Sequence, residues 1–444
     1  MSDIPWFGTV PKGWRKTRLK WTIKTSRNGT WGSDPDGEND LPCVRVADFD
    51  RQTFRVSDNI PTLRAVEQSE RRHRELRRGD LLIEKSGGGE LQPVGTVVLY
   101  DSDRPAVCSN FIARLVAAPE YDPHYLNYLH AALYATKLTF RSIKQTTGIQ
   151  NLDAYSYFSE LIPSPPLDEQ RVIARFLDDE TAKLDRLVAA KRRLAELLRE
   201  RLAVELDLAI TRGLRPRMLR ASGDRWLTSV PSDWTVVPLG RLTRYLSYGF
   251  TNPMPTAAEG PYMVTANDIG DGVVNYASAR KTTIEAFTAE LTAKSRPKAG
   301  DILVTKDGTL GRVAVADGKA MCINQSVALL RVDQKRVLVP FVSELLRALT
   351  YQARMIFDAG GTTIKHIYIS KIIKMPVAVP SLDEQSELVS FAAAKRERYE
   401  VLLGRIERCT TCLEEYRSSL IASAVTGRID VRNYRPQEAA ALCQ

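Results

Sequence analysis

The chain has 444 residues, a net charge of +10 and a sequence pI near 9.2. This length exceeds what one hydrophobic core supports, and 43% hydrophobic residues is ordinary for a folded soluble protein. The excess of basic residues favours a polyanionic partner but does not by itself identify nucleic acid. With no long apolar run, no secretory signal pattern and six scattered cysteines, we expect a cytoplasmic protein with two modules.

The first 164 residues predict a mixed α/β module. Short strand-like runs at Leu81–Glu84 and Gly95–Tyr100 stand between clusters of glycine and proline, and a helical stretch follows near Tyr125–Phe140. Two consecutive prolines at 165–166 end this segment, so we expect the first module to span 1–164.

A long helix is predicted over 167–210. Apolar residues recur close to every seventh position along it, which is typical of a coiled coil. Asp168 and Glu169 fall in its first turn, where the helix dipole favours carboxylates, and Gly213 ends it. At about 1.5 Å per residue the helix is about 66 Å long. We expect a central spacer helix over 165–215.

A second mixed segment follows. The arginine-rich stretch Arg212–Trp226, with its glycine and proline, is the best linker candidate. Beyond it the pattern predicts strands at Ile302–Thr305 and Arg312–Ala316 and a helical stretch at Phe341–Phe357. We therefore expect a second α/β module over 216–379.

The last part of the chain, 380–444, predicts a second spacer helix with a tail. Residues spaced alternately by four and three positions form an unbroken series from Leu388 to Leu420. Such a series is a coiled-coil seam, which needs a partner helix. The first long helix is the expected antiparallel partner, and two independent helices, each packed on its own module, are the alternative. Cys409-Thr-Thr-Cys412 has the spacing of a redox or zinc pair, but Cys409 lies on the seam, so we expect core packing.

The landmarks of the two halves are duplicated, which predicts a pseudo-two-fold molecule. Pro-Pro-Leu-Asp-Glu-Gln opens the first long helix and Pro-Ser-Leu-Asp-Glu-Gln opens the second, 380 − 165 = 215 residues later. The helices end in Ala-Ile-Thr-Arg-Gly and Ala-Val-Thr-Gly. Two further motifs recur: Val-Pro-x-x-Trp at Val10–Trp14 and Val230–Trp234, and Gly-Asp-(Leu/Ile)-Leu at the strands from Gly79 and Gly300.

Together these duplicated motifs resemble the specificity subunit of a type I restriction-modification system, over nearly the whole chain. Thr211-Arg212-Gly213 departs slightly from the Thr-Gly order of Thr426-Gly427. The resemblance implies two target-recognition domains, each of which reads one half of a split site in double-stranded DNA. It also implies that the long helices dock methyltransferase subunits, two by expectation, for adenine methylation, and that motor-nuclease subunits join for restriction.

Sequence-specific contact requires cations on phosphates, and amides, hydroxyls or cations at base edges. Matched loops follow strands in both halves, Lys85–Gly89 and Lys306–Thr309, and a second matched pair aligns Thr147 with Thr362, since 170 − 147 and 385 − 362 both equal 23. Amides that could pair with adenine stand beside them. The predicted DNA-binding residues are Lys85, Ser86, Gly87, Asn110, Lys144, Thr146, Thr147, Lys306, Thr309, Asn324, Gln325, Thr362, Thr363 and Lys365.

Each of these features also has a plainer interpretation. The glycine loops also suit ordinary tight hairpins, although their duplicated position favours a function, and an asparagine in a turn is often a buried structural residue. The basic run from Arg71 to Arg78 is interleaved with Glu67, Glu70 and Glu75, which favours a solvated helix face over a phosphate clamp. Tyr248 suits a core or rim position better than stacking on a base.

Motifs for catalysis are missing from the sequence. An adenine methyltransferase holds its flipped base with an Asn-Pro-Pro-aromatic motif, and Asn252-Pro253-Met254-Pro255 lacks the second proline and the aromatic residue. The glycine-rich nucleotide motifs are absent, and the four histidines show no metal spacing. We predict a non-catalytic subunit without cofactor or metal. A nuclease with a degenerate acidic site and a coiled-coil scaffold without a DNA role are the alternatives.

Overall fold

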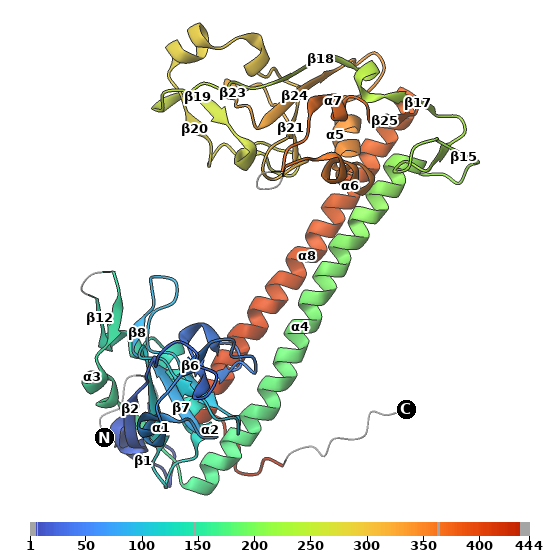
Figure 1. Ribbon diagram of the computed structural model, residues 1–444. Helices are drawn as coiled ribbons and strands as arrows, with labels where there is room; N and C mark the ends of the chain where they lie inside the picture. Colours follow the sequence, from blue (N-terminus) through green and yellow to red (C-terminus); the bar gives the residue numbers. More distant parts are fainter. Residues whose placement is uncertain (1–5, 7, 146–147, 362–364, 436–444) are drawn as a thin grey trace. The chain divides into compact units, whose positions relative to one another are not determined.

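The computed structural model describes residues 6, 8–145, 148–361 and 365–435. It divides into two compact units, residues 1–192 with 408–444, and residues 193–407. Each unit contains one mixed α/β module together with parts of the long helices α4 (Leu167–Arg212) and α8 (Leu382–Val425), as Figure 1 shows. The predicted fold class is confirmed. Among the described residues, every helix is too short or too polar to cross a lipid bilayer.

The first module is built on a six-stranded sheet with the order β2–β11–β7–β9–β5–β4. Its core joins this sheet to helix α2, whose first turn is capped by the Asp122 carboxylate, which accepts bonds from the amides of His124 and Tyr125. Two three-stranded sheets (β10–β3–β6 and β12–β13–β8) and the pair β1–β14 complete it. The bounds are β1 Arg15–Arg18, η1 Leu19–Thr22, β2 Ile23–Asn28, β3 Asp40–Val44, η2 Val46–Asp48, β4 Phe49–Asp50, β5 Arg55–Val56, β6 Leu63–Ala65, α1 Gln68–Arg74, β7 Asp80–Glu84, β8 Ser86–Gly87, β9 Val97–Tyr100, β10 Val107–Cys108, β11 Ile112–Ala117, α2 Pro123–Ala135, η3 Thr139–Ser142, β12 Ile143–Gln145, β13 Gln150–Leu152, α3 Ala154–Phe158 and β14 Leu161–Ser164.

The second module repeats this plan with fewer strands. The sheet β18–β24–β21–β22 corresponds to β2–β11–β7–β9, and the parallel pair β19–β23 corresponds to β3–β10. The pair β17–β25 corresponds to β1–β14. The bounds are β15 Leu219–Ala221, β16 Ser229–Pro231, β17 Thr235–Pro238, η4 Leu239–Leu242, β18 Thr243–Tyr248, β19 Ala257–Val264, η5 Ala266–Asp268, β20 Arg280–Lys281, η6 Ala286–Glu290, η7 Ala293–Ser295, β21 Ile302–Thr305, β22 Val313–Val315, β23 Met321–Ile323, β24 Val327–Val332, α5 Val339–Arg347, α6 Leu349–Asp358, α7 Ile369–Ile372 and β25 Pro376–Val379.

The stretch predicted as a linker, 212–226, is not an unstructured connection. It contains strand β15, which pairs with β16. The guanidinium of Arg217 forms an ion pair of 2.7 Å with Glu384 in the first turn of α8, and the indole of Trp234 donates to the same carboxylate at 3.1 Å. Composition alone does not reveal such long-range partners, so the stretch resembled a linker.

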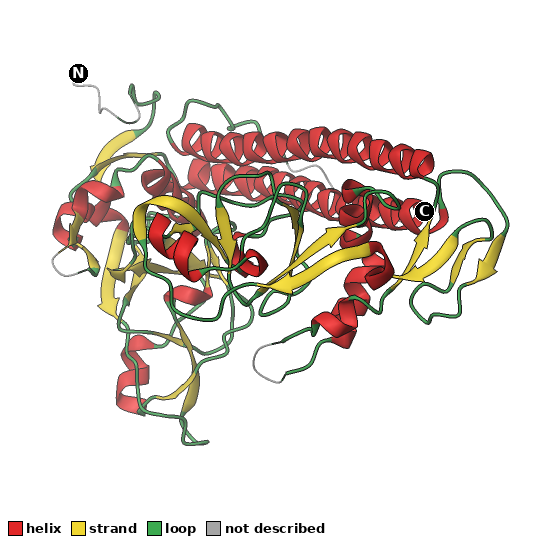
Figure 2. Cartoon of the chain, turned by 90° about the horizontal axis from the view of Figure 1, so that it is seen from above, coloured by secondary structure: helices red, strands yellow, loops and turns green. Residues whose placement is uncertain are grey.

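Helices α4 and α8 pack together and run in opposite directions (Figures 1 and 2). In the first unit, the buried Arg417 on α8 lies 3.0 Å from Asp185 on α4. In the second unit, Glu205 on α4 accepts bonds from Lys395 at 2.7 Å and Tyr399 at 3.1 Å. Hydrogen bonds from Lys395 first, then from Arg201 and Tyr399, lower the pKa of Glu205 to about 2. The expected antiparallel helix pair is confirmed.

The predicted position of Cys409 is wrong, because its side chain is exposed. A straight α-helix has 3.6 residues per turn, so a strict heptad seam drifts around it by about 20° per heptad. Leu388, Ala392 and Tyr399 on the seam are buried, whereas Tyr416 further along is 56% exposed. The seam read from the sequence is therefore interrupted: it is exposed at Cys409 and Tyr416 and buried again at its last residue, Leu420.

The glutamine of the repeated helix motif is a buried structural residue in both copies. The Gln385 side chain is inaccessible to solvent; its carbonyl accepts from the Leu338 amide at 2.8 Å, and its amide donates to the carbonyls of Arg336 at 3.1 Å and Pro380 at 3.0 Å. Gln170 makes the same three bonds, at 2.9, 3.1 and 2.9 Å, to the segment before α2 and to Pro165. Each glutamine thus ties the start of a long helix to the start of its module's main helix.

We expect Gln385→Ala to destabilise the second unit by about 2–3 kcal/mol, because it leaves buried backbone groups without partners. Gln385→Glu should cost at least as much, since a carboxylate would face two carbonyl oxygens. Thermal and urea unfolding monitored by circular dichroism measure the loss. Ser386→Ala, at the adjacent exposed position, is the control and should unfold like the wild type. Equal stability of Gln385→Ala and Ser386→Ala would contradict the structural role.

One histidine has a structural role in the first core. His130 is 1% exposed, and its Nδ1 lies 2.6 Å from the hydroxyl of the buried Tyr157. Burial lowers the pKa of His130 to about 3, because the charged imidazolium would lose its hydration. The folded protein therefore keeps this imidazole neutral over the whole range in which a free histidine titrates.

This depressed pKa predicts acid sensitivity. Below about pH 6.5 the unfolded chain binds a proton at this histidine that the folded chain does not, so the free energy of unfolding falls by up to about 1.4 kcal/mol per pH unit. Urea unfolding at pH 7 and pH 5 measures the slope. His130→Gln should reduce that slope, whereas His73→Gln, at an exposed position, should leave it unchanged. A slope that persists in His130→Gln would assign the acid sensitivity to other groups.

Candidate nucleic-acid interface

Two tight turns occupy matching places in the two modules, and each presents a side-chain carboxamide. The turns Ser109–Ile112 and Asn324–Val327 are each closed by a bond from the last amide to the first carbonyl, of 3.0 and 3.1 Å. Asn110 and Gln325 hold the second position and are exposed. Their separation, 325 − 110 = 215, equals the offset of the helix motifs. The two carboxamides are therefore structural counterparts.

The lysine of each predicted loop is bound to this turn through its backbone. The amides of Lys85 and Lys306 each donate, at 2.8 Å, to the carbonyl of the residue after the carboxamide. Their carbonyls accept from Leu152 at 2.8 Å and Ile367 at 2.9 Å. Three segments far apart in the sequence thus meet in each module: the lysine loop, the carboxamide turn, and the segment that follows the predicted threonine loop.

In the first module the glycine loop is shaped by short strand pairing. Ser86 donates from its hydroxyl to Asn151 at 2.6 Å, where β8 pairs with β13. Gly87 has φ +123°, and a Cβ on Gly88 would lie 2.6 Å from the Val94 amide, so both positions require glycine. Burial lowers the pKa of Lys85.

The third loop of the first module is described only in part. Lys144 forms an exposed ion pair of 2.7 Å with Asp153. Thr146 and Thr147, and Thr362 and Thr363 in the second module, lie outside the described residues.

In the second module the predicted lysine is already neutralised. Lys306 is only 7% exposed; its ammonium lies 2.9 Å from the Asp307 carboxylate and 5.5 Å from the centre of the Tyr248 ring. His366 bonds to the same carboxylate through Nδ1. The charge of Lys306 is thus paired within the module, and its contact with DNA stays a prediction.

Gln325 stands between two hollows of the second module. The first hollow, of about 600 Å³, is lined by residues that include Tyr248, Asp307 and Tyr368. The second, of about 720 Å³, is lined by the polar Asn252 and the apolar Met254, among others. Gln325 lines both hollows. The other predicted residues of this region, Thr309 and Lys365, are exposed.

The side chains of Asn324 and Gln325, both predicted to contact DNA, lie in different surroundings. The Asn324 carboxamide accepts bonds from the amide and the hydroxyl of Ser326, at 3.2 and 2.5 Å, and so holds the turn. The plainer interpretation, a structural asparagine in a turn, therefore applies to Asn324. Gln325 donates its backbone amide to Phe250 at 2.8 Å, which fixes the chain beneath its exposed side chain.

Sequence reasoning missed the residues that support these loops. Asn151, Ser326 and His366 hold the turns, and Glu84, 1% exposed, forms a 2.8 Å ion pair with Arg51 at the base of the glycine loop. Burial raises the pKa of Glu84. The 215-residue offset between Asn110 and Gln325 was a usable signal; no comparable signal marks the supporting residues, because their partners are distant in sequence.

The two α/β modules present the same lysine loop and carboxamide turn from duplicated frames. This arrangement is that of a recognition protein with two similar binding modules. No group of His, Cys, Asp or Glu side chains among the described residues is placed to hold a metal ion. Comparison with known proteins adds the family. Residues 231–393 match the family described as type I restriction modification DNA specificity domain.

Relatives and solved structures extend the match to the whole chain. It is 22% identical to the putative MjaX specificity subunit of Methanocaldococcus jannaschii, over 96% of both chains, and 22% identical to the EcoBI specificity subunit of Escherichia coli, over 73% of this chain and 70% of that one. A solved type I restriction-modification assembly contains a chain with a similar fold (TM-score 0.71, 17% identity, 95% of this chain and 100% of that one). The HsdS subunit of Thermoanaerobacter tengcongensis follows at TM-score 0.54 (17% identity, 97% and 100%). The second module therefore carries a type I restriction modification DNA specificity domain, and along nearly its whole length the chain is similar to specificity subunits of type I restriction-modification systems.

The Lys306 environment predicts a stability effect. Asp307→Ala leaves a nearly buried ammonium without its carboxylate, so we expect a loss of about 1–3 kcal/mol in the second unit. The double variant Lys306→Met/Asp307→Ala removes the unpaired charge and should recover most of that loss. Thermal unfolding of the two variants and the wild type measures both effects. Equal destabilisation of the single and double variants would contradict the internal pairing.

Proposed function

We propose that this chain reads a bipartite site in double-stranded DNA and directs adenine methylation and restriction by partner subunits in the cytoplasm. The observation that carries the proposal is the duplicated turn with a different exposed carboxamide in each module, Asn110 and Gln325. Two copies of one frame suit a split site, and different side chains at the same place suit two different half-sites. The target-recognition domains would be 1–164 and 216–379, with spacers at 165–215 and 380–444.

Base readout would centre on the carboxamides. An asparagine or glutamine side chain can pair with adenine through a donor and an acceptor at once, which discriminates by about 1–3 kcal/mol against another base. Both turns are fixed through their backbones, so the side chain is presented from a rigid support. Ser86, Gly87, Lys85 and the loops around Lys144 and Lys365 would contact DNA beside them, and Thr309 would do so in the second module.

Partner subunits would bind along the long helices. Apolar side chains on α4 that are 42–47% exposed recur at helical spacing: Leu187, Leu194, Leu197, Val204 and Leu208. Such a stripe on a helix already paired with α8 suits the helices of another protein. We propose two methyltransferase subunits there, with motor-nuclease subunits joining for cleavage. The solved assembly of similar fold is described as a type I restriction-modification complex, which supports this partner class.

The test is a methylome. The chain is co-expressed with its methyltransferase in a host free of adenine methylation, and modified adenines are mapped genome-wide. We expect a bipartite motif with a fixed gap that disappears when this chain is omitted. Methylation by an active methyltransferase that ignores this chain would contradict the proposal and favour a scaffold without a DNA role. DNA cleavage by the isolated chain with a divalent metal would favour a nuclease.

The same measurement tests the readout residue. Gln325→Ala should relax the base preference at one position of one half-site and leave the other half-site and the gap unchanged, because only one module is altered. Gln334→Ala, an exposed glutamine of the same unit away from the turn, is the matched control and should reproduce the wild-type motif. An unaltered motif in Gln325→Ala would exclude this side chain from readout.

A further inference from the structure

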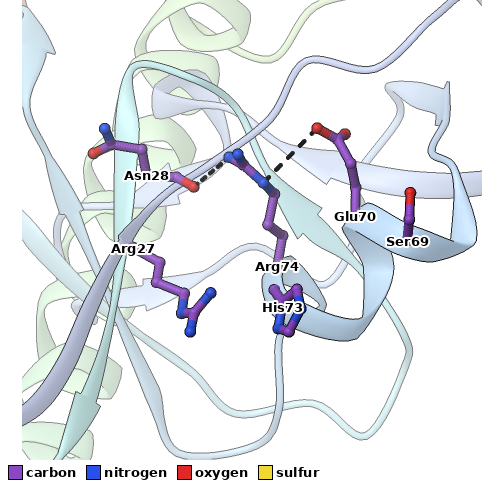
Figure 3. A pocket seen from close by; sticks show the side chains of 6 residues that line it. All are labelled: Arg27, Asn28, Ser69, Glu70, His73 and Arg74. Carbon is purple, nitrogen blue, oxygen red and sulfur yellow. Dashed lines mark hydrogen bonds and ion pairs between the residues drawn. The ribbon is translucent and has the colours of Figure 1, made fainter.

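We infer that the first module seats a phosphate of the DNA backbone in a basic hollow beside the Asn110 turn, bound by Arg27 and Arg74. This inference rests on the proposed function and adds a site to it. The hollow measures about 410 Å³ and is lined by Arg27 and Asn28 at the end of β2 and by Ser69, Glu70, His73 and Arg74 on α1, as Figure 3 shows.

The hollow adjoins the carboxamide turn. Directly after Asn28, the Gly29 amide donates to the carbonyl of Ile112 at 2.9 Å, and the next amide donates to Cys108 at 2.8 Å. A Cβ on Gly29 would lie 2.1 Å from the Cys108 carbonyl oxygen, so only glycine allows this close approach. The strand end that lines the hollow is therefore packed against the segment that presents Asn110, and an anion bound there would lie next to a base-reading side chain.

Arg74 is fixed at one wall of the hollow. Its guanidinium donates through Nη1 to the carbonyls of Asn28 and Gly29, both at 2.8 Å, and Nε lies 4.0 Å from Glu70 (Figure 3). Glu70 also accepts a bond of 2.9 Å from Thr30. These contacts order the arginine in advance, so little side-chain entropy remains to be lost on binding.

Arg27 supplies the uncompensated charge. It stands opposite Arg114 in the pairing of β2 with β11, and Arg114 is neutralised by Asp80 at 2.6 Å. The exposed guanidinium of Arg27 has no hydrogen-bond or ion-pair partner within the described part of the chain. A free guanidinium beside an ordered one, with His73 next to them, suits a phosphate, because arginine binds phosphate oxygens through two parallel donors. Phosphate contacts set the register of base readout.

The second module differs at this place. Gly249 is the counterpart of Gly29, at an offset of 220, and its Cβ position is likewise blocked by a carbonyl, that of Ile323 at 1.8 Å. The same offset places Ser247 where the first module has Arg27. The phosphate site is therefore specific to the first module. It also revises the interpretation of the basic run around α1 as a solvated face: Arg74 is turned into the hollow, whereas Arg72 is exposed.

The test measures the salt dependence of DNA affinity. The full chain, assembled with its methyltransferase, is titrated with a duplex that carries the motif found in the methylome, over 50–200 mM KCl. Each phosphate contact contributes about 0.9 to the slope of the logarithm of the association constant against the logarithm of the salt concentration. We expect Arg27→Ala to make the slope shallower by about 0.9 and to leave the methylated motif unchanged, and Arg27→Lys to restore the slope. Arg72→Ala on the same helix is the matched control and should keep the wild-type slope.

Several outcomes would overturn the site. A slope in Arg27→Ala equal to that of the wild type excludes a phosphate contact, and an altered motif assigns Arg27 to base readout instead. Weaker assembly with the methyltransferase in the absence of DNA would assign the hollow to an acidic protein partner. Failure of the wild-type complex to bind its own motif would instead refute the proposed function. Matching unfolding midpoints of Arg27→Ala and the wild type confirm that the variant is folded.

Discussion

The buried glutamine at the start of each long helix is the interaction on which the rest of the architecture depends. Gln170 and Gln385 each satisfy one amide and two carbonyls that would otherwise be buried without partners. Because the bonds join a spacer helix to the start of its module's main helix, they fix the direction in which the helix leaves the module. Three directed bonds at a solvent-free position define an angle in a way that apolar contacts, which have no direction, do not. The repeated motif is thus explained by its structural role.

Upon this shared frame the two modules carry different surfaces. Asn110 and Gln325 occupy one structural position, and Arg27 and Ser247 another. The backbone bonds that hold the turns do not involve the exposed side chains, so these can differ without a change in the frame. Specificity for DNA is a property of such exposed groups, whereas the frame determines only where they stand. A duplicated fold can therefore present two unlike surfaces at little structural cost.

Charge by itself is a poor guide to the interface of this protein. Lys306, which follows a strand as a phosphate-binding lysine would, is neutralised by Asp307, and Arg114 and Arg51 are paired with Asp80 and Glu84. A paired, buried cation has already exchanged its hydration for a protein partner and has little affinity left for phosphate. Arg27 differs because, among the described residues, no carboxylate forms an ion pair with it, although Glu70 lines the same hollow. The net charge of +10 is consistent with DNA as a partner but does not locate the contact.

The sequence by itself determined the class, the two modules and the two long helices, because duplicated motifs and helical periodicity are local signals that survive without coordinates. It also placed β21 and the starts of α4 and α8 closely, since prolines and first-turn acids mark helix boundaries. Only the tertiary structure decided the rest. It placed Cys409 at an exposed position, because a helix with 3.6 residues per turn does not keep every position of a heptad pattern on its buried face. It also paired the apparent linker with β16. It showed that Asn324 supports a turn while Gln325 is presented, since the difference lies in a hydrogen bond to Ser326 that composition does not encode. Arg27 and Arg74 converge because the segment after β2 is bonded to α1, as the hydrogen bond from Thr30 to Glu70, 40 residues later, shows.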